Sequence, residues 1–201
     1  MHQLKERRPY SKSGYYDIDP DGEGDMAPFS VYCDMNDKYG VGVTVISHDS
    51  ENRARVEGFE SPGSYSRDIH YTGASLRQLA SLTSVSSHCE QFIKYECRHS
   101  GFWFVNPYGW WVSRDSAKMT YWGGASPGSG KCACGMTSSC AGYRYRIGCN
   151  CDMNDYVWRE DSGLLTDKTK LPVKQLRFGD TGEWWELGYH TLGKFISYGT
   201  A

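Results

Sequence analysis

The chain has 201 residues, enough to bury a hydrophobic core in one large domain, and it carries a formal net charge of −2. That charge excludes the basic field that binding to a nucleic-acid backbone requires, and no apolar run reaches the roughly 18 residues of a membrane-spanning helix. The fifteen tyrosines, seven tryptophans, seven phenylalanines and 23 glycines favour short strands and ring-bearing loops over a helical bundle.

The first expected elements form an antiparallel meander near the N-terminus. The stretch PFSVYCDM (28–35) alternates apolar and polar side chains, and GVGVTVIS (40–47) is rich in β-branched residues. An acidic, glycine-broken stretch precedes them at residues 13–25 and is typical of a turn. These patterns predict β-structure at this end of the chain.

One helix is predicted, between residues 72 and 84. Leu76, Leu79 and Leu82 recur at helical spacing, and Ser75 directly before them is a suitable N-cap.

The remainder of the chain favours strands and ordered loops. Apolar positions at 92–95 and 102–104 predict strands, and LPVKQLRFGD (171–180) is expected to be the last strand. From Asn106 onward Gly, Pro and Cys are frequent, which predicts long ordered loops. The predicted fold class is therefore α+β and β-rich: an antiparallel sheet, one or two short helices and long stapled loops, with no linker dividing residues 1–201.

Eight cysteines are expected to form disulfides: Cys33, Cys89, Cys97, Cys132, Cys134, Cys140, Cys149 and Cys151. A zinc cluster is the alternative, but C-x-C in an extended segment points its two thiols to opposite faces, whereas zinc knuckles use C-x-x-C. Disulfides also stabilise a glycine-rich segment that cannot build its own core, and they imply an oxidising compartment. We therefore expect a secreted or extracellular protein. Spacing alone does not set the connectivity, and Cys89 with Cys97 is one candidate pair.

A cluster of acidic and amide side chains lies between residues 152 and 161. Ca²⁺ prefers hard oxygen ligands on an irregular segment, which makes Asp152, Asn154 and Asp161 candidate calcium ligands. The alternative is that these are solvated loop charges, and the residues alone leave both interpretations open.

Catalytic motifs are not recognisable in the sequence. The histidines and serines lie outside nucleophile contexts such as G-x-S-x-G or H-E-x-x-H, and the cysteines are expected to be bonded to one another. An enzyme is therefore not predicted.

Short stretches spread over most of the chain resemble known sequences. SKSGYYDIDPDG followed by PFSVYCDM resembles the opening of a fibrinogen C-terminal domain. CEQFIKYEC, YWGG, KCACG, CNCD, LPV and GDT resemble, more specifically, the fibrinogen-like segment of contactin-associated proteins, the neurexin-like adhesion receptors. These matches extend from Ser13 to Thr181 and predict a single fibrinogen-related recognition domain.

The resemblance implies a non-catalytic domain that binds glycans, acetylated sugars or proteins. It also implies Ca²⁺ in a C-terminal acidic loop, the region of Asp152, Asn154 and Asp161. Related domains usually carry a cysteine before the Ser-Gly-Tyr turn that pairs with the one at Cys33, and another near the C-terminal end, but this chain has neither. Cys33 is then free, paired elsewhere, or bridged to a second chain.

Two functions are compatible with this sequence. The first is a lectin, in which aromatic rings stack on the apolar face of a sugar such as a galactoside; multivalent binding would favour a homo-oligomer. The predicted ligand-binding residues are Trp110, Trp111, Trp184, Trp185 and His190. The second is an adhesion module that contacts a cell-surface protein or glycoprotein. The shortness of the chain favours the lectin, and the closest resemblance favours adhesion.

Overall fold

The computed structural model describes residues 8–199 and is β-rich, with two antiparallel sheets and few helices, as the composition predicts. The strands are β1 (Gly14–Ile18), β2 (Phe29–Asp34), β3 (Val43–Ile46), β4 (Ala54–Val56), β5 (Tyr65–Asp68), β6 (His88–Arg98), β7 (Trp110–Val112), β8 (Lys118–Met119), β9 (Arg159–Leu165), β10 (Gln175–Phe178) and β11 (Leu187–Tyr198). The helices are α2 (Asp37–Gly40), α3 (Leu76–Ser84) and α4 (Ala133–Met136), with 3₁₀ turns η1 (Tyr143–Tyr145) and η2 (Cys151–Met153). None of the helices in the described range is long and apolar enough to cross a bilayer.

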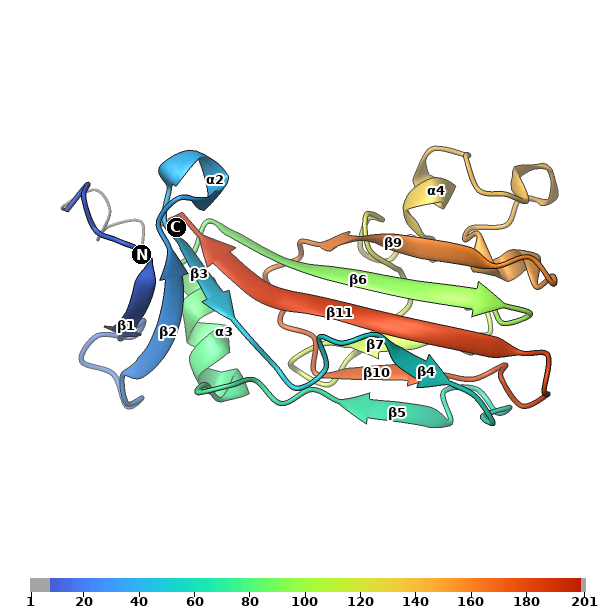
Figure 1. The fold of residues 1–201 in the computed structure, drawn as a ribbon, viewed down its shortest axis with the longest axis horizontal. Coiled ribbons are helices and arrows are strands. Elements are labelled where there is room, and N and C mark those ends of the chain that lie inside the picture. The colour runs from blue at the N-terminus through green and yellow to red at the C-terminus, as the bar shows by residue number, and fades with distance from the viewer. Residues whose placement is uncertain (1–7, 200–201) are drawn as a thin grey trace.

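The larger sheet has seven strands in the order β1-β2-β3-β11-β6-β9, and β4 also pairs with β11. Its long strands β6 and β11 extend from the end of the molecule that holds β1 to the opposite end, and the shorter β9 lies beside β6 in the part away from β1 (Figure 1). The expected meander is present, because β2 pairs with β3. It has a further strand, β1, which lies within residues 13–25, so the expectation of a turn is wrong for Gly14–Ile18. The smaller sheet has the order β5-β10-β7-β8.

Helix α3 begins where the sequence predicts it. The Ser75 hydroxyl accepts a hydrogen bond from the Gln78 backbone N–H, and the Gln78 side chain accepts one from the Ser75 backbone N–H, which forms a capping box. Leu79 and Leu82 are the buried leucines of its inner face. Replacing such a cap by alanine typically costs about 1 kcal/mol, so the cap defines the start of the helix.

Aromatic rings fill the space between the two sheets. Phe178 of β10 stacks on Tyr95 of β6 with ring centroids 4.3 Å apart, and on His190 of β11 at 5.8 Å. Phe102 and Trp122 belong to the same buried cluster, with centroids 4.6 Å apart. Burying one large apolar side chain stabilises a fold by about 1.5–3 kcal/mol, so these rings join the sheets.

Two expected strands differ from those observed. Residues 102–104 form no strand, because the backbone N–H groups of Phe102 and Trp103 donate to the Asp152 carboxylate and not to a neighbouring strand. The strand expected at 171–180 is confined to β10 and is not the last, since β11 follows it.

Strand β11 was not predicted from the sequence, although it is the longest strand of the described chain. Gly188 and Gly193 interrupt its apolar pattern, and its register against β6 shifts between Leu192 and Phe195. Gly188 is required by packing, because a β-carbon there would collide with the Tyr95 hydroxyl.

Candidate functional site

The solvent-facing side of the larger sheet carries a row of cross-strand neighbours. Tyr189 of β11 lies opposite Glu96 of β6, and Glu96 lies opposite Glu160 of β9. Since side chains alternate along a strand, Tyr189 is half-buried on the outer face while His190, next to it, lies in the core.

Arginines and aromatic rings cluster around this row. The guanidinium carbon of Arg53 lies 3.3 Å from the Tyr189 ring centroid, and Arg53 donates to both Glu96 carboxylate oxygens at 2.8 and 3.2 Å. Arg98 lies over Trp158 at 5.5 Å, and the Trp158 and Tyr189 ring centroids are 5.8 Å apart. We define the aromatic–arginine surface as Arg53, Arg98, Tyr156, Trp158 and Tyr189.

Much of the aromatic–arginine surface is open to solvent. Trp158 is 45% exposed and Tyr156 is 68% exposed. The end of β6, the start of β9 and the start of β11 meet here, at the end of the molecule away from β1 (Figure 1). Trp, Tyr and Arg are the residues most enriched among those that dominate binding energy at protein interfaces. The chemistry of this surface therefore suits a protein partner.

Two of the predicted ligand-binding residues border the aromatic–arginine surface. Trp184 is 79% exposed and packs edge-on against Trp185, with ring centroids 5.3 Å apart. The Trp185 carbonyl accepts a hydrogen bond from Arg98 at 3.1 Å. The structure thus places this pair beside Trp158 through their shared neighbour Arg98.

Two other predicted ligand-binding residues are corrected by their burial. Trp111 and His190 are fully buried and offer no face to a ligand in solvent. The Trp111 indole donates to the Tyr121 carbonyl at 3.0 Å, and His190 Nε2 lies 2.7 Å from the Tyr65 hydroxyl. Trp110, the remaining candidate, lies on the smaller sheet and lines a separate pocket.

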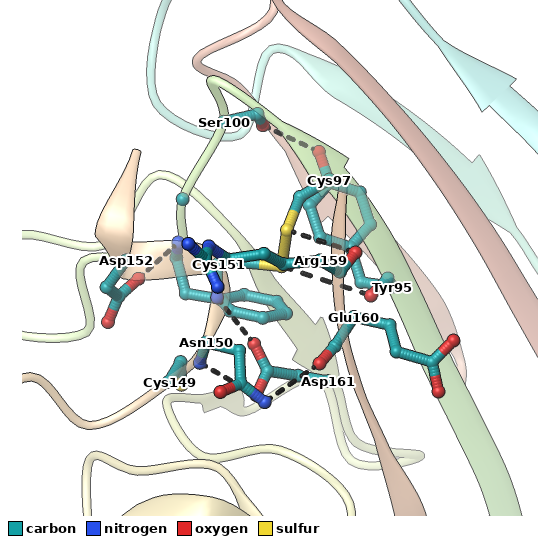
Figure 2. The surroundings of a disulfide bond; sticks show 12 residues. Tyr95, Cys97, Ser100, Cys149, Asn150, Cys151, Asp152, Arg159, Glu160 and Asp161 are labelled. Carbon is teal, nitrogen blue, oxygen red and sulfur yellow. Dashed lines mark hydrogen bonds between the residues drawn. A yellow bond between two sulfur atoms is a disulfide. The ribbon is translucent and has the colours of Figure 1, made fainter. Parts of the chain in front are cut away.

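The acidic segment before β9 folds around a disulfide (Figure 2). The Asp161 carboxylate accepts hydrogen bonds from the backbone N–H groups of Asn150 at 3.0 Å and Cys151 at 2.9 Å. Burial raises the pKa of Asp161 to about 6, and the negative charge of Asp152 adds to this shift. Desolvation likewise raises the pKa of Asp152.

These contacts give the expected calcium ligands structural roles. Asp152 accepts from Phe102 and Trp103, as described above, and Asp161 holds the chain at the η2 turn. Asn154 ends that turn in a left-handed conformation, and its Oδ1 atom is buried without a hydrogen-bond partner among the described residues. Both carboxylates already accept hydrogen bonds from backbone N–H groups, which favours a structural role over that of calcium ligands. Calcium binding stays a prediction.

Six cysteines form three disulfides: Cys97–Cys151, Cys132–Cys149 and Cys134–Cys140. The candidate pair Cys89 with Cys97 is therefore wrong, because Cys97 joins β6 to the η2 turn instead (Figure 2).

The prediction that all eight cysteines are bonded is also corrected. Cys33 and Cys89 are free and buried in the two sheet strands β2 and β6. Burial raises the pKa of both thiols, to about 12 for Cys33 and about 11 for Cys89, which makes them poorly reactive.

Among the described residues, one group of side chains is a candidate for the alternative, a metal site with thiolate ligands. Ligand atoms of Cys132, Cys149 and Asp161 lie within 4.8 Å of one another. The Sγ atoms of Cys132 and Cys149 form a disulfide with each other, so neither can bind a metal ion as a thiolate. The arrangement favours the disulfide interpretation.

Sequence reasoning missed most of the aromatic–arginine surface. The alternation in CEQFIKYECR would have placed Lys94, Glu96 and Arg98 on one face of a strand, and it was the available signal. Arg53 and Trp158 lie outside strands, and only the fold brings them to this face.

Comparisons with known proteins agree with the sequence resemblance at a coarser level. No family model matches the chain. It is 38% identical over 185 residues to neurexin-4 of Drosophila melanogaster, covering 88% of this chain and 14% of that protein. It is 40% identical over 172 residues to contactin-associated protein 1 of Rattus norvegicus and of Homo sapiens, covering 84% of this chain and 12% of each relative. The chain is thus a homologue of one segment, 12% to 14% of the length, of neurexin-4 and contactin-associated protein 1.

Proposed function

We propose that this chain is an extracellular adhesion module that binds a cell-surface protein through the aromatic–arginine surface. The observation that carries the proposal is the exposed Trp158 ring, with Arg98 over it and Tyr189 beside it, together with the exposed Tyr156 two residues before it in the chain. Homology to contactin-associated protein 1 supports it, and the name of that relative suggests a contactin as the first partner to test.

The shape and chemistry of this surface favour a protein over a sugar. It lies on the outer face of a sheet, where Tyr189, Glu96 and Glu160 follow one another across three strands. Sugar sites are usually concave and lined by converging polar groups, whereas protein interfaces centre on exposed aromatic and arginine anchors. The arginines here are already oriented by rings and carboxylates, so little side-chain entropy is lost on binding.

An extracellular setting is part of the same proposal. Three disulfides are typical of proteins that fold in an oxidising compartment. The finer assignment, a fibrinogen-related domain, also belongs to the proposal and is supported by the motifs in the sequence. Self-association of the domain stays a prediction.

The proposal is tested by binding the multimerised domain to cells that display a contactin. We measure the binding that depends on the contactin, as the difference between displaying cells and parental cells. We expect this difference to be lost when the cells are treated with a protease and kept when their N-glycans and glycosaminoglycans are removed enzymatically. A partner that is a protein predicts this pattern, because only the protease destroys the surface that Trp158 contacts. Loss after the glycan-removing enzymes alone would instead support a lectin.

A further inference from the structure

The outer face of the smaller sheet holds a pocket of about 350 Å³. Strand register creates it: Val112 of β7 lies opposite Lys118 of β8 and Gln175 of β10, and Trp110 lies opposite Arg177. These five residues share one face, whereas Trp111 and Leu176, which alternate with them along β7 and β10, are buried. Lys174 and Ser116 complete the lining.

Three cationic side chains line this pocket, and each of them contacts a neutral group. Lys118 Nζ lies over the Trp110 ring, 3.7 Å from its centroid. Lys174 Nζ donates to the Ser116 hydroxyl at 2.7 Å, and Arg177 Nε donates to the Gly63 carbonyl at 2.7 Å. Within residues 8–199 none of the three cations makes an ion pair.

A lysine just outside the pocket does have an acidic partner. Lys170, a few residues before this pocket, pairs with Asp115 at 2.9 Å. The acid nearest in register, Asp68 of β5, accepts a hydrogen bond from Gln175 at 2.6 Å and lies three strand spacings, about 14 Å, from β8. Asp115, which precedes Ser116 in the chain, is already paired with Lys170, so it is not an ion-pair partner of the pocket's cations among the described residues.

We propose that this pocket binds an acidic saccharide through its sulfate or carboxylate groups. Lys118, Lys174 and Arg177 would contact the anionic groups, and the Gln175 amide and the Ser116 hydroxyl would contact sugar hydroxyls. The apolar edge of Val112 and the Trp110 ring complete a wall for the sugar's C–H face.

Size and charge density favour a saccharide over an acidic peptide. A volume of about 350 Å³ is at the small end of ligand sites and suits one or two sugar rings. Three cations that line so small a volume match a sugar that carries several anionic groups on one ring. A lone peptide carboxylate would leave two of these cations without an anionic partner.

The site is distinct from the aromatic–arginine surface. Its residues come from β7, β8 and β10, whereas that surface is built on β6, β9 and β11. A Trp158→Ala variant should therefore bind the saccharide as the wild type does, which separates this proposal from the adhesion function.

The test uses isothermal titration calorimetry with four probes: a heparin hexasaccharide, a hyaluronan hexasaccharide, a neutral galactoside and a hexaglutamate peptide. We expect one or both acidic saccharides to bind, more weakly at high salt, and the galactoside not to bind. Binding of hyaluronan would identify the carboxylate as sufficient, whereas binding of heparin alone would identify the sulfate.

Variants connect the binding to the pocket. The double variant Lys118→Gln with Lys174→Gln should weaken binding about tenfold or more, because two charged contacts are lost. Replacing Lys118 by Arg retains the charge and should keep most of the affinity, which excludes misfolding as the cause. Arg77→Gln removes one exposed charge on α3 and should change affinity less than about twofold.

Three outcomes would overturn the proposal. Equal losses in the Arg77→Gln control and the pocket variant would indicate binding to surface charge in general. Tighter binding of the glutamate peptide than of either acidic saccharide would assign the pocket to a peptide. Absence of binding by every acidic saccharide at low salt would leave the pocket without this ligand.

Discussion

At the scale of single residues, His190 lies between Tyr65 and Phe178 in the core, and burial lowers its pKa to about 4. The unfolded chain takes up a proton on this imidazole below about pH 6.5 while the folded protein does not. Stability from this group is therefore complete above pH 6.5 and is lost as the pH falls toward 4. A pKa shift of this size corresponds to a change of about 3 kcal/mol in the free energy of unfolding.

We expect His190→Gln to be less stable than the wild type at pH 7 and to lose less stability between pH 6.5 and 4. Urea unfolding at several pH values measures this. His88→Gln is the matched control, because His88 is exposed and should keep the wild-type slope. If the free energy of unfolding of His190→Gln falls with pH as steeply as that of the wild type, the burial of a neutral imidazole at position 190 is contradicted.

Asp161 acts in the opposite direction over part of the same pH range. Its folded-state pKa is raised to about 6, so the folded protein binds a proton more readily than the unfolded chain, and this group favours folding as the pH falls from 6 toward 3.8. The His190 effect is therefore read from the difference between variant and wild type at each pH, which cancels the Asp161 contribution.

At the scale of elements, side chains alternate along β7, so its two adjacent tryptophans lie on opposite faces of the smaller sheet. Trp111 is fully buried and hydrogen-bonded to the Tyr121 carbonyl, whereas Trp110 lines the outer pocket. We expect Trp111→Ala to lower the free energy of unfolding by about 3–5 kcal/mol, because it leaves a large cavity. Trp110→Ala should cost about 1 kcal/mol or less. Denaturant unfolding of the pair checks this, and equal costs would contradict the assigned register.

The same contrast shows what sequence patterns can and cannot predict. Helix α3 was predictable, because its leucine spacing and its Ser75 cap are local. The adjacent tryptophans were not separable, since a three-residue strand is too short for alternation to stand out. Strand β11 was missed for a different reason: Gly188 is there to admit the Tyr95 ring, a contact between distant parts of the chain.

At the scale of the whole molecule, disulfides were predictable as a class but not as pairs. Their connectivity depends on which strands the fold brings together, as with Cys97 of β6 and Cys151 of η2. The candidate site follows the same rule. The Trp184–Trp185 pair was visible in the sequence, but Arg98 and Trp158 join it only where the ends of three strands meet.

The most direct measurement of the central claim is the affinity of the domain for a contactin ectodomain by biolayer interferometry. The double variant Trp158→Ala with Arg98→Ala should bind about tenfold or more weakly than the wild type, because it removes the two central anchors of the aromatic–arginine surface. Tyr15→Ala is the control, since Tyr15 is an exposed ring on β1 at the other end of the molecule (Figure 1), and this variant should bind as the wild type does. Wild-type affinity in the double variant, or no binding by the wild type, would contradict the account.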